Sequence, residues 1–112
     1  MAEPYTHRRR WPRLPVAVEC RIEGVSTPLR LTELSFGGGY VDTTASLNAG
    51  DPVSLALIID GEEATVSGRT IYTHPAMGFG FAFDLKELPE PSRTRIAAFL
   101  KRSGISETDG AE

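Results

Sequence analysis

The fold is decided by one stretch of strand and turn, Val53-Ser54-Leu55-Ala56-Leu57-Ile58-Ile59-Asp60-Gly61. Val, Leu, Leu and Ile recur at every second position from 53 to 59, which is the period of a strand with one buried face. Asp60-Gly61 ends the run, and both residues tolerate the positive φ angles of a two-residue hairpin turn. A strand-like run over residues 65–72 follows. The stretch therefore predicts an antiparallel hairpin.

Alternating runs on both sides of the hairpin predict further strands. Apolar residues occupy every second position of residues 16–22, and phenylalanine occupies every second position of residues 79–83. Between them, the alternation that begins at Leu29 slips by one residue at Leu34. Such a slip moves side chains to the opposite face, so we expect a bulge or strand end over residues 32–34.

Two further segments complete the predicted domain. Gly37-Gly38-Gly39 is unfavourable inside a regular strand, because glycine loses extra backbone entropy and packs no side chain. Tyr40-Val41 then resumes a short strand. A C-terminal helix is predicted to begin near Ser92, which is placed to cap it, because apolar residues from Ile96 to Leu100 recur at helical spacing.

These patterns predict an all-β domain of five or six antiparallel strands closed by one helix, as a small barrel or a sandwich. A chain of 112 residues fits one domain and needs no metal or disulfide to support its core. We expect three parts: an arginine-rich, flexible arm over residues 1–15, the β domain with its helix over residues 16–102, and a disordered tail over residues 103–112.

The charge is unevenly distributed along the chain. The net charge is −3, but residues 1–30 contain six arginines and three acids, whereas the remainder is acidic. Arginine pairs with phosphate and guanine edges through a planar fork, so an arginine-rich terminus favours specific recognition of an anion. An acidic barrel argues against general binding to DNA or RNA, which requires stacking aromatic residues along a basic groove.

Few residues could support catalysis or metal binding. Cys20 is the sole cysteine and alternates with core positions, so we interpret it as inert packing. His7 and His74 are far apart, and His74 before Pro75 is read as a turn residue. The sequence thus predicts no enzyme, no metal site and no cofactor. It also contains neither a membrane span nor a signal peptide, which favours the cytoplasm.

Two short stretches carry the candidate binding residues. Arg8-Arg9-Arg10-Trp11-Pro12-Arg13 supplies guanidinium groups, and Glu33-Leu34-Ser35-Phe36-Gly37-Gly38-Gly39 supplies an acid, a hydroxyl and exposed backbone. Each stretch also has a structural interpretation. The arginines could be a solvated arm, Trp11 an apolar anchor, and the glycines a bulge at a barrel corner. Taken together, they predict a pocket for a small anionic ligand.

The order of these stretches resembles the PilZ domain, a bacterial receptor module for cyclic di-GMP. R-x-x-x-R matches at Arg9 and Arg13, and D/N-x-S-x-x-G aligns at Glu33, Ser35 and Gly38. Gly80-Phe81-Ala82-Phe83 resembles a late strand of the family. The resemblance spans residues 8–101 and implies a six-stranded antiparallel barrel with a C-terminal helix and no enzymatic activity. It also implies a role in second-messenger signalling, in motility or biofilm formation.

The resemblance implies a role for each candidate residue. Arg9 and Arg13 would fork onto guanine or phosphate, and Arg8 would add a stacking or phosphate contact beside an intercalated ligand dimer. Glu33 would accept from a guanine N–H edge, and Ser35 would add a neutral hydrogen bond. Gly37 and Gly38 would let the ligand approach the backbone. The arm would close on the ligand and so signal to an unidentified partner protein.

Glu33 departs from the family pattern, which has Asp or Asn at this position. Its longer side chain displaces the carboxylate by about one C–C bond, ~1.5 Å, which exceeds the ~0.5 Å tolerance typical of an organised site. An alternative follows: a degenerate PilZ-like adaptor that binds proteins but not cyclic di-GMP.

Overall fold

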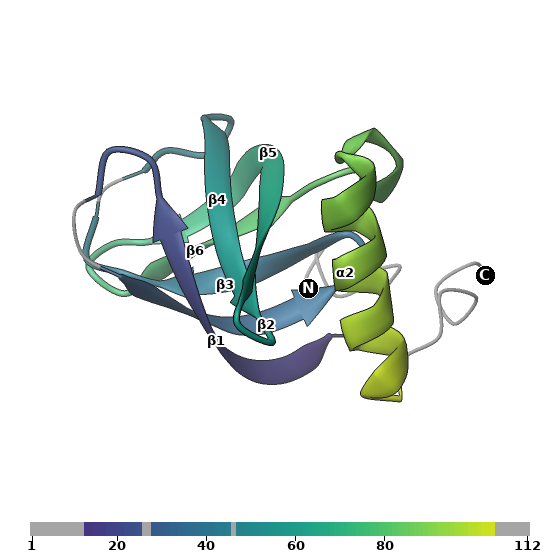
Figure 1. Cartoon of the computed structure of the whole chain (residues 1–112). Coiled ribbons are helices and arrows are strands. Elements are labelled where there is room, and N and C mark those ends of the chain that lie inside the picture. Colours follow the sequence, from purple (N-terminus) through teal and green to yellow (C-terminus); the bar gives the residue numbers. More distant parts are fainter. Residues whose placement is uncertain (1–12, 26–27, 46, 105–112) are drawn as a thin grey trace, which may run out of the picture.

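The computed structural model describes residues 13–25, 28–45 and 47–104, which form a β-barrel with one C-terminal α-helix (Figure 1). Its elements follow in chain order: β1 (Leu14–Ile22), β2 (Leu29–Ser35), β3 (Gly38–Asp42), β4 (Pro52–Ile59), β5 (Glu62–His74), β6 (Gly78–Ala82), the 3₁₀ turn η1 (Leu85–Glu87) and α2 (Glu90–Arg102).

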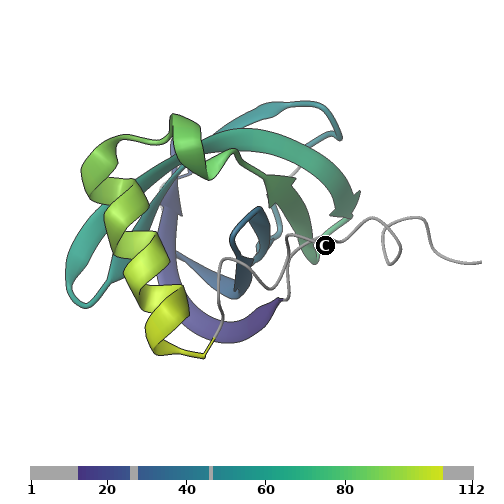
Figure 2. The ribbon, with the colours of Figure 1, turned by 90° about the vertical axis from the view of Figure 1, so that its right-hand side faces the viewer.

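All strand pairs are antiparallel, and the sheet closes in the order β1-β2-β3-β6-β5-β4. The six-stranded barrel with a C-terminal helix is therefore confirmed. β1 begins at Leu14, two residues before the expected start, because Leu14 and Pro15 pair with Leu34 and Glu33 of β2. Figure 2 shows the strands encircling the interior, with α2 beside one end of the barrel.

The predicted hairpin is the β4–β5 turn. Asp60 and Gly61 have φ angles of 55° and 81°, and Ile59 pairs with Glu62 across them. Two consecutive positive φ angles characterise the turn whose twist matches that of the flanking strands. The prediction made from Asp60-Gly61 is confirmed.

Alternation along the strands produces the core. Most inward positions of β1, β4, β5 and β6 are apolar and buried, with the polar Thr70 of β5 as an exception, and α2 adds Ile96 and Leu100, both with 0% exposure. Cys20 is also fully buried, and burial raises the pKa of its thiol to about 11. Because Cys20 is a member of the buried core cluster, its interpretation as a packing residue is confirmed.

Three strands of the barrel contain a register shift. The shifts lie between Pro15 and Val18 in β1, between Leu31 and Glu33 in β2, and between Thr70 and Tyr72 in β5. The second is the irregularity predicted over residues 32–34. An extra residue reverses the face on which the following side chains lie.

The start of α2 differs from the prediction. The helix begins at Glu90 with Pro89 at the N-cap, so Ser92 lies inside the first turn and is not the cap. The Ser92 hydroxyl instead accepts a hydrogen bond from the backbone N–H of Thr65, at 2.8 Å. Ser92 is only 6% exposed, and it ties α2 to β5. The Ser92 hydroxyl thus makes a tertiary hydrogen bond to β5 in place of the predicted helix-capping bond.

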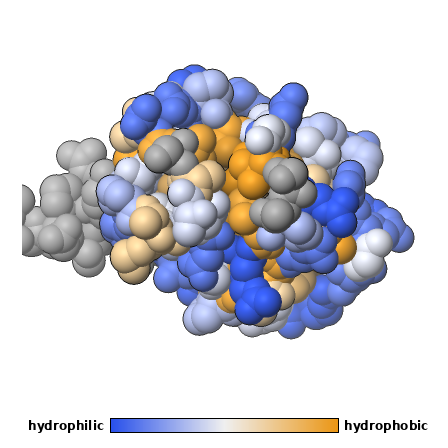
Figure 3. Space-filling view, turned by 90° about the vertical axis from the view of Figure 1, so that its left-hand side faces the viewer, coloured by the Kyte–Doolittle hydropathy of each residue, from blue (hydrophilic) through white to orange (hydrophobic). Residues whose placement is uncertain are grey.

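The surface away from α2 is mixed. Figure 3 shows apolar side chains gathered between polar ones on that side of the molecule. A shallow hollow is lined by Ile22, Leu47, Pro52 and Val53 together with polar neighbours. In the part of the chain that the structure describes, no helix is long and apolar enough to cross a bilayer.

Candidate functional site

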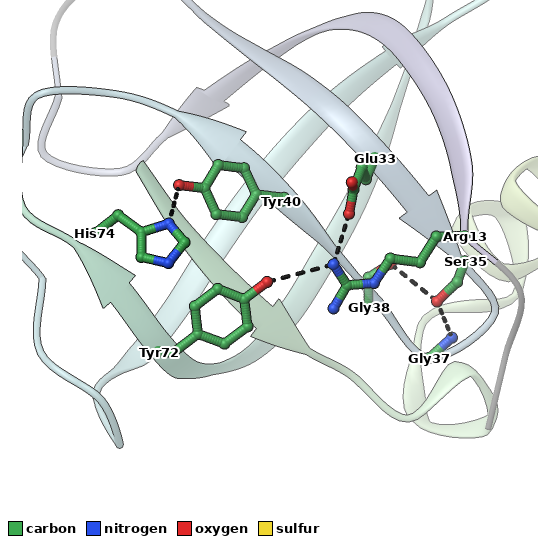
Figure 4. Close-up of polar contacts among 8 residues, drawn as sticks. All are labelled: Arg13, Glu33, Ser35, Gly37, Gly38, Tyr40, Tyr72 and His74. Atoms are coloured by element: carbon green, nitrogen blue, oxygen red, sulfur yellow. Dashed lines mark hydrogen bonds and ion pairs between the residues drawn. The ribbon is translucent and has the colours of Figure 1, made fainter. Parts of the chain in front are cut away.

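Arg13 and Glu33 lie together on the outside of the barrel, although they are separated by 20 residues. Arg13 Nη1 donates to Glu33 Oε1 at 2.6 Å and to the Tyr72 hydroxyl at 3.3 Å (Figure 4). Glu33 belongs to β2 and Tyr72 to β5, whereas β3 and β6 lie between these strands. The Arg13 side chain therefore links two strands across the outer surface of two others.

The Arg13 guanidinium is held in its charged form. Desolvation by burial, the largest single contribution, lowers the pKa of Arg13. Hydrogen bonds to Tyr72 and Glu33 and their charges together outweigh it, so the pKa is raised above its ordinary value. The side chain of Arg13 is 21% exposed and that of Glu33 is 41% exposed. The pair is thus accessible from solvent while Arg13 is partly enclosed.

Strand register places four outward residues in one row. Glu33 pairs with Tyr40, and Tyr40 pairs with Gly80, which pairs on its other side with Tyr72. Directly paired residues lie on the same face of a sheet. Phe79 and Phe81 occupy the inner face of β6, so this row lies on the outer face. We call the outer faces of β2, β3, β6 and β5, together with Arg13, the site wall.

The register shifts in β2 and β5 create this row. Leu31 and Leu34 are both buried, and the shift between Leu31 and Glu33 lets them remain inside while Glu33 turns outward. In β5, Thr70 pairs with the buried Phe81, whereas Tyr72 pairs with the outward Gly80. Regular alternation would have placed Thr70 and Tyr72 on one face. The irregularity is therefore what presents Tyr72 at the surface.

Ser35 and the glycines after it form the β2–β3 turn. Ser35 Oγ accepts from the Gly37 N–H at 3.1 Å and donates to the Gly38 carbonyl at 3.3 Å. Ser35 is 6% exposed, and Gly38 is also buried. A Cβ at Gly38 would lie 2.1 Å from the Phe81 carbonyl oxygen, so only glycine allows β3 this close to β6. Ser35 and Gly38 thus support the turn beside Arg13.

Three aromatic side chains continue the site wall away from Arg13. The ring centroids of Tyr40 and Tyr72 are 6.1 Å apart, and that of His74 is 5.7 Å from Tyr40 and 5.3 Å from Tyr72. The Tyr40 hydroxyl is hydrogen-bonded to His74 Nδ1 at 2.9 Å (Figure 4). Burial and the nearby acidic groups of Tyr72, Asp42 and Glu33 raise the pKa of Tyr40, so its hydroxyl is protonated at neutral pH. We call Tyr40, Tyr72 and His74 the aromatic patch.

The structure brings together part of the predicted site. Arg13, Glu33 and the turn formed by Ser35, Gly37 and Gly38 lie in one region. Arg8 and Arg9, with the rest of the expected arm up to residue 12, lie outside the described residues, as do residues 105–112 of the expected tail.

The sequence reasoning missed the aromatic patch. His74 was interpreted as a turn residue, but it is the last residue of β5 and contacts two tyrosines. One sequence signal was available. Phe79 and Phe81 point inward, so the residues that alternate with them, Gly78 and Gly80, form an outer face with no side chains of its own. Such a surface can receive rings from neighbouring strands.

In the described segments, no group of three or more His, Cys, Asp or Glu residues could hold a metal ion. Around the aromatic patch, the site wall offers the Arg13 guanidinium, the Glu33 carboxylate, the tyrosine hydroxyls and the His74 imidazole. The exposed carboxylate of Asp42 lies in the next outward row, beside Gly78 and His74. This set is suited to binding a ligand with both anionic and hydrogen-bonding groups.

The fold and site define a small all-β barrel closed by a C-terminal helix, with a charged and aromatic surface on one wall. A family model described as "PilZ domain" matches residues 7–102. The chain belongs to the PilZ domain family. A comparison with curated proteins found no match.

Three solved structures share this fold. The Bacillus subtilis inhibitor of motility, MotI/DgrA, has a TM-score of 0.69 and 13% identity. The PilZ domain of CeSA from a cellulose-synthesizing bacterium has a TM-score of 0.57 and 21% identity. Borreliella burgdorferi PlzA, solved in complex with c-di-GMP, has a TM-score of 0.51 and 17% identity. At these identities the similarity establishes the fold alone.

The overlap with these structures differs in extent. The matched regions cover 86%, 82% and 76% of this chain, in the same order. They cover 50% of the MotI/DgrA chain, 97% of the CeSA domain and 38% of PlzA. The chain thus spans about half the length of MotI/DgrA.

Proposed function

We propose that this protein is a cyclic di-GMP receptor that acts in the cytoplasm and signals to a partner protein through its N-terminal arm. The observation that carries the proposal is the ion pair between Arg13 and Glu33, at 2.6 Å. It joins the two family motifs on one outer wall of the barrel. Membership of the PilZ family supports the choice of ligand.

The chemistry of the site wall suits this ligand. Cyclic di-GMP presents two phosphates and two guanines, and arginine can fork onto a phosphate or onto guanine O6 and N7. Arg13 supplies one such two-pronged contact. Further contacts of this kind are proposed for Arg8 and Arg9. The Glu33 carboxylate accepts from the N–H groups of guanine. The turn formed by Ser35, Gly37 and Gly38 supports the backbone beside these groups.

The proposed signal is ordering of the arm. β1 begins at Leu14, directly after Arg13, so a ligand held by Arg13 lies where the arm enters the barrel. Ordering a flexible segment costs conformational entropy, which ligand contacts must exceed. The ordered arm would present a different surface to the partner protein.

Calorimetry with cyclic di-GMP tests the proposal. Arg13→Ala is expected to raise Kd roughly 10- to 150-fold, because a charge-assisted hydrogen bond contributes about 1.5–3 kcal/mol. Arg9→Ala is expected to weaken binding to a similar extent. Arg95→Ala is the matched control, since Arg95 also forms an ion pair, with Glu62, but lies on α2. Saturable binding that survives the Arg9 and Arg13 substitutions would disprove the site.

Glu33 favours a second candidate, an adaptor that binds proteins but no nucleotide. Its carboxylate already pairs with Arg13, so the ligand must share or displace this contact. Glu33→Asp shortens the side chain by about one C–C bond, ~1.5 Å. Binding by the Glu33→Asp variant together with no binding by the natural protein would support the degenerate adaptor. Binding by the natural protein would exclude it.

A further inference from the structure

The two tyrosine rings of the aromatic patch pack against the backbone of glycines in β6 rather than against side chains. Tyr40 lies over Gly78, where a Cβ would come within 2.7 Å of the Tyr40 ring atom Cε1. Tyr72 lies over Gly80, where a Cβ would come within 2.5 Å of Cζ. At Gly80 the three nearest atoms all belong to the Tyr72 side chain, so a larger residue there would displace that ring; at Gly78 a Cβ would also meet the Val41 carbonyl oxygen, at 2.3 Å. The two tyrosine rings pack against the outer face of β6, where the glycines have no side chains to exclude them.

This arrangement does not serve the core. The apolar interior of the barrel is complete on the other face of β6, where Phe79 and Phe81 are each 1% exposed. Tyr40, Tyr72 and His74 are not members of the core cluster. Glycine inside a strand costs roughly 0.5–1 kcal/mol relative to alanine. Gly80 thus makes room for the Tyr72 ring on a surface that lies outside the core, whereas Gly78 also allows the close approach of β3.

The position of the patch relative to Arg13 indicates what it contacts. Arg13 Nη1 is 3.3 Å from the Tyr72 hydroxyl, so a phosphate or base held by the guanidinium lies at the edge of the patch. The pair of tyrosine rings is tilted by only 32°, which leaves a broad aromatic surface beside a fixed cation. Base stacking on aromatic side chains tolerates any base, because every base has a π face.

We propose that Tyr40 and Tyr72 form a stacking surface for a purine ring of the bound dinucleotide, outside the two motifs. The inference rests on the proposed function, because it assigns a subsite to the same ligand. Arg13 fixes the charged part of the ligand, and the patch receives one base beside it. His74 holds the Tyr40 ring in place through the contact of its Nδ1 with the Tyr40 hydroxyl, 2.9 Å long.

The competing explanation is that the rings only cover the glycines of β6. Three substitutions separate the two explanations. Tyr40→Leu and Tyr72→Leu keep an apolar cover but remove the π face, whereas Tyr72→Phe keeps the ring and removes only the hydroxyl. Thermal unfolding of each variant measures the covering role, and calorimetry with cyclic di-GMP measures the stacking role.

We expect Tyr72→Leu and Tyr40→Leu to raise Kd roughly 5- to 150-fold, the range that corresponds to about 1–3 kcal/mol per stacked base. Tyr72→Phe is expected to stay within about 3-fold of the natural protein, since the ring is retained. If both leucine variants bind as tightly as the natural protein while Arg13→Ala does not, the stacking surface is disproved and the receptor function stands.

A measurement on the natural protein avoids variants that fail to fold. In a complex saturated with cyclic di-GMP, nuclear Overhauser contacts between a guanine H8 and the Tyr40 or Tyr72 ring protons are expected. Contacts from H8 only to other parts of the protein would overturn the inference. If the natural protein binds no cyclic di-GMP, the receptor proposal fails and the subsite fails with it.

Discussion

Two regions of this barrel each contain arginine–carboxylate pairs and one buried serine, yet only one resembles a binding site. The site wall has Arg13 with Glu33 and the buried Ser35. The contacts between α2 and the β4–β5 hairpin, which we call the helix seam, have Arg95 with Glu62, Arg102 with Asp60, and the buried Ser92. Ser35 and Ser92 are equally exposed, at 6%. The presence of ion pairs and buried hydroxyls therefore does not distinguish a candidate binding site from a packing contact between a helix and a sheet.

The backbone around the two regions makes the difference. At the helix seam, β4 and β5 pair without interruption from Pro52 with Arg69 to Ile59 with Glu62. At the site wall, register shifts in β2 and β5 turn Glu33 and Tyr72 outward, and glycines in β6 make room for two rings. Irregular strands and outward glycines are costly and thus more informative than the charges they display.

The largest expected effect concerns a glycine of the site wall, compared with one that follows the end of α2. Gly38→Ala places a Cβ 2.1 Å from the Phe81 carbonyl oxygen, which is backbone and cannot rotate away. We expect a loss of about 3 kcal/mol or more in the free energy of unfolding. Gly104, after the end of α2, has φ +95° and no neighbour within 4 Å, so Gly104→Ala should cost only about 1 kcal/mol. Urea unfolding of both variants measures the difference, and equal losses would contradict it.

A second prediction concerns Cys20, which lies between the two regions because it pairs with Leu29 of β2 and Leu57 of β4. Burial raises its pKa from 9.0 to about 11. The unfolded chain therefore loses the thiol proton first, so the contribution to stability is complete below about pH 9 and is lost between about pH 9 and pH 11. The loss should reach at most about 2–3 kcal/mol.

Unfolding of the natural protein and of Cys20→Ala across this pH range tests the prediction. The variant lacks the thiol but keeps every tyrosine and lysine that titrates at alkaline pH, so the difference between the two pH profiles isolates Cys20. Parallel profiles would show that burial does not control this thiol.

The two serines give a smaller and sharper test. Ser92→Ala leaves the Thr65 N–H without its acceptor, and Ser35→Ala does the same to the Gly37 N–H. Each should lower the free energy of unfolding by about 1–2 kcal/mol. Only Ser35→Ala is expected to weaken cyclic di-GMP binding as well, because its turn adjoins Arg13. A loss of affinity in Ser92→Ala that equals that of Ser35→Ala would remove the distinction between the regions.

The smallest expected effects come from the carboxylates. Glu62→Gln and Glu33→Gln each remove one charge from a solvent-accessible ion pair, and such pairs contribute about 0–1 kcal/mol. Both variants should therefore unfold within about 1 kcal/mol of the natural protein. Cyclic di-GMP affinity should change in Glu33→Gln and remain constant in Glu62→Gln. Calorimetry on the pair checks this, and an unchanged affinity in both would exclude Glu33 from the site.

Local sequence patterns predicted most of the barrel. Asp60-Gly61 identified its hairpin, the slip at Leu34 identified the irregularity in β2, and alternation identified the core positions of β4 and β6. Ser92 was assigned the wrong role because its hydroxyl is engaged by Thr65, a residue 27 positions away. A cap is a local rule, and it fails where a distant backbone group competes for the same oxygen.

The candidate site was predictable only in part, for a similar reason. The spacing of the motifs indicated Arg13 and Glu33, but no local pattern places Tyr72 beside them. The shift after Thr70 reverses the face of Tyr72 and His74, and a sequence read with unbroken alternation assigns them to the wrong side. Neighbouring strands determine such a shift, because the pairing partners of β5 select its register.

The register shifts also bear on how such a surface arises through mutation. Side chains alternate with a period of two, so gain or loss of one codon within a strand exchanges its inner and outer faces beyond that point. Deletion of Ile71 would turn Tyr72 and His74 toward the interior and abolish the patch in one genetic step. The reverse insertion would create it on a barrel that previously had none. On this fold, the aromatic patch is therefore separated from a wall without it by a change of one residue in strand length.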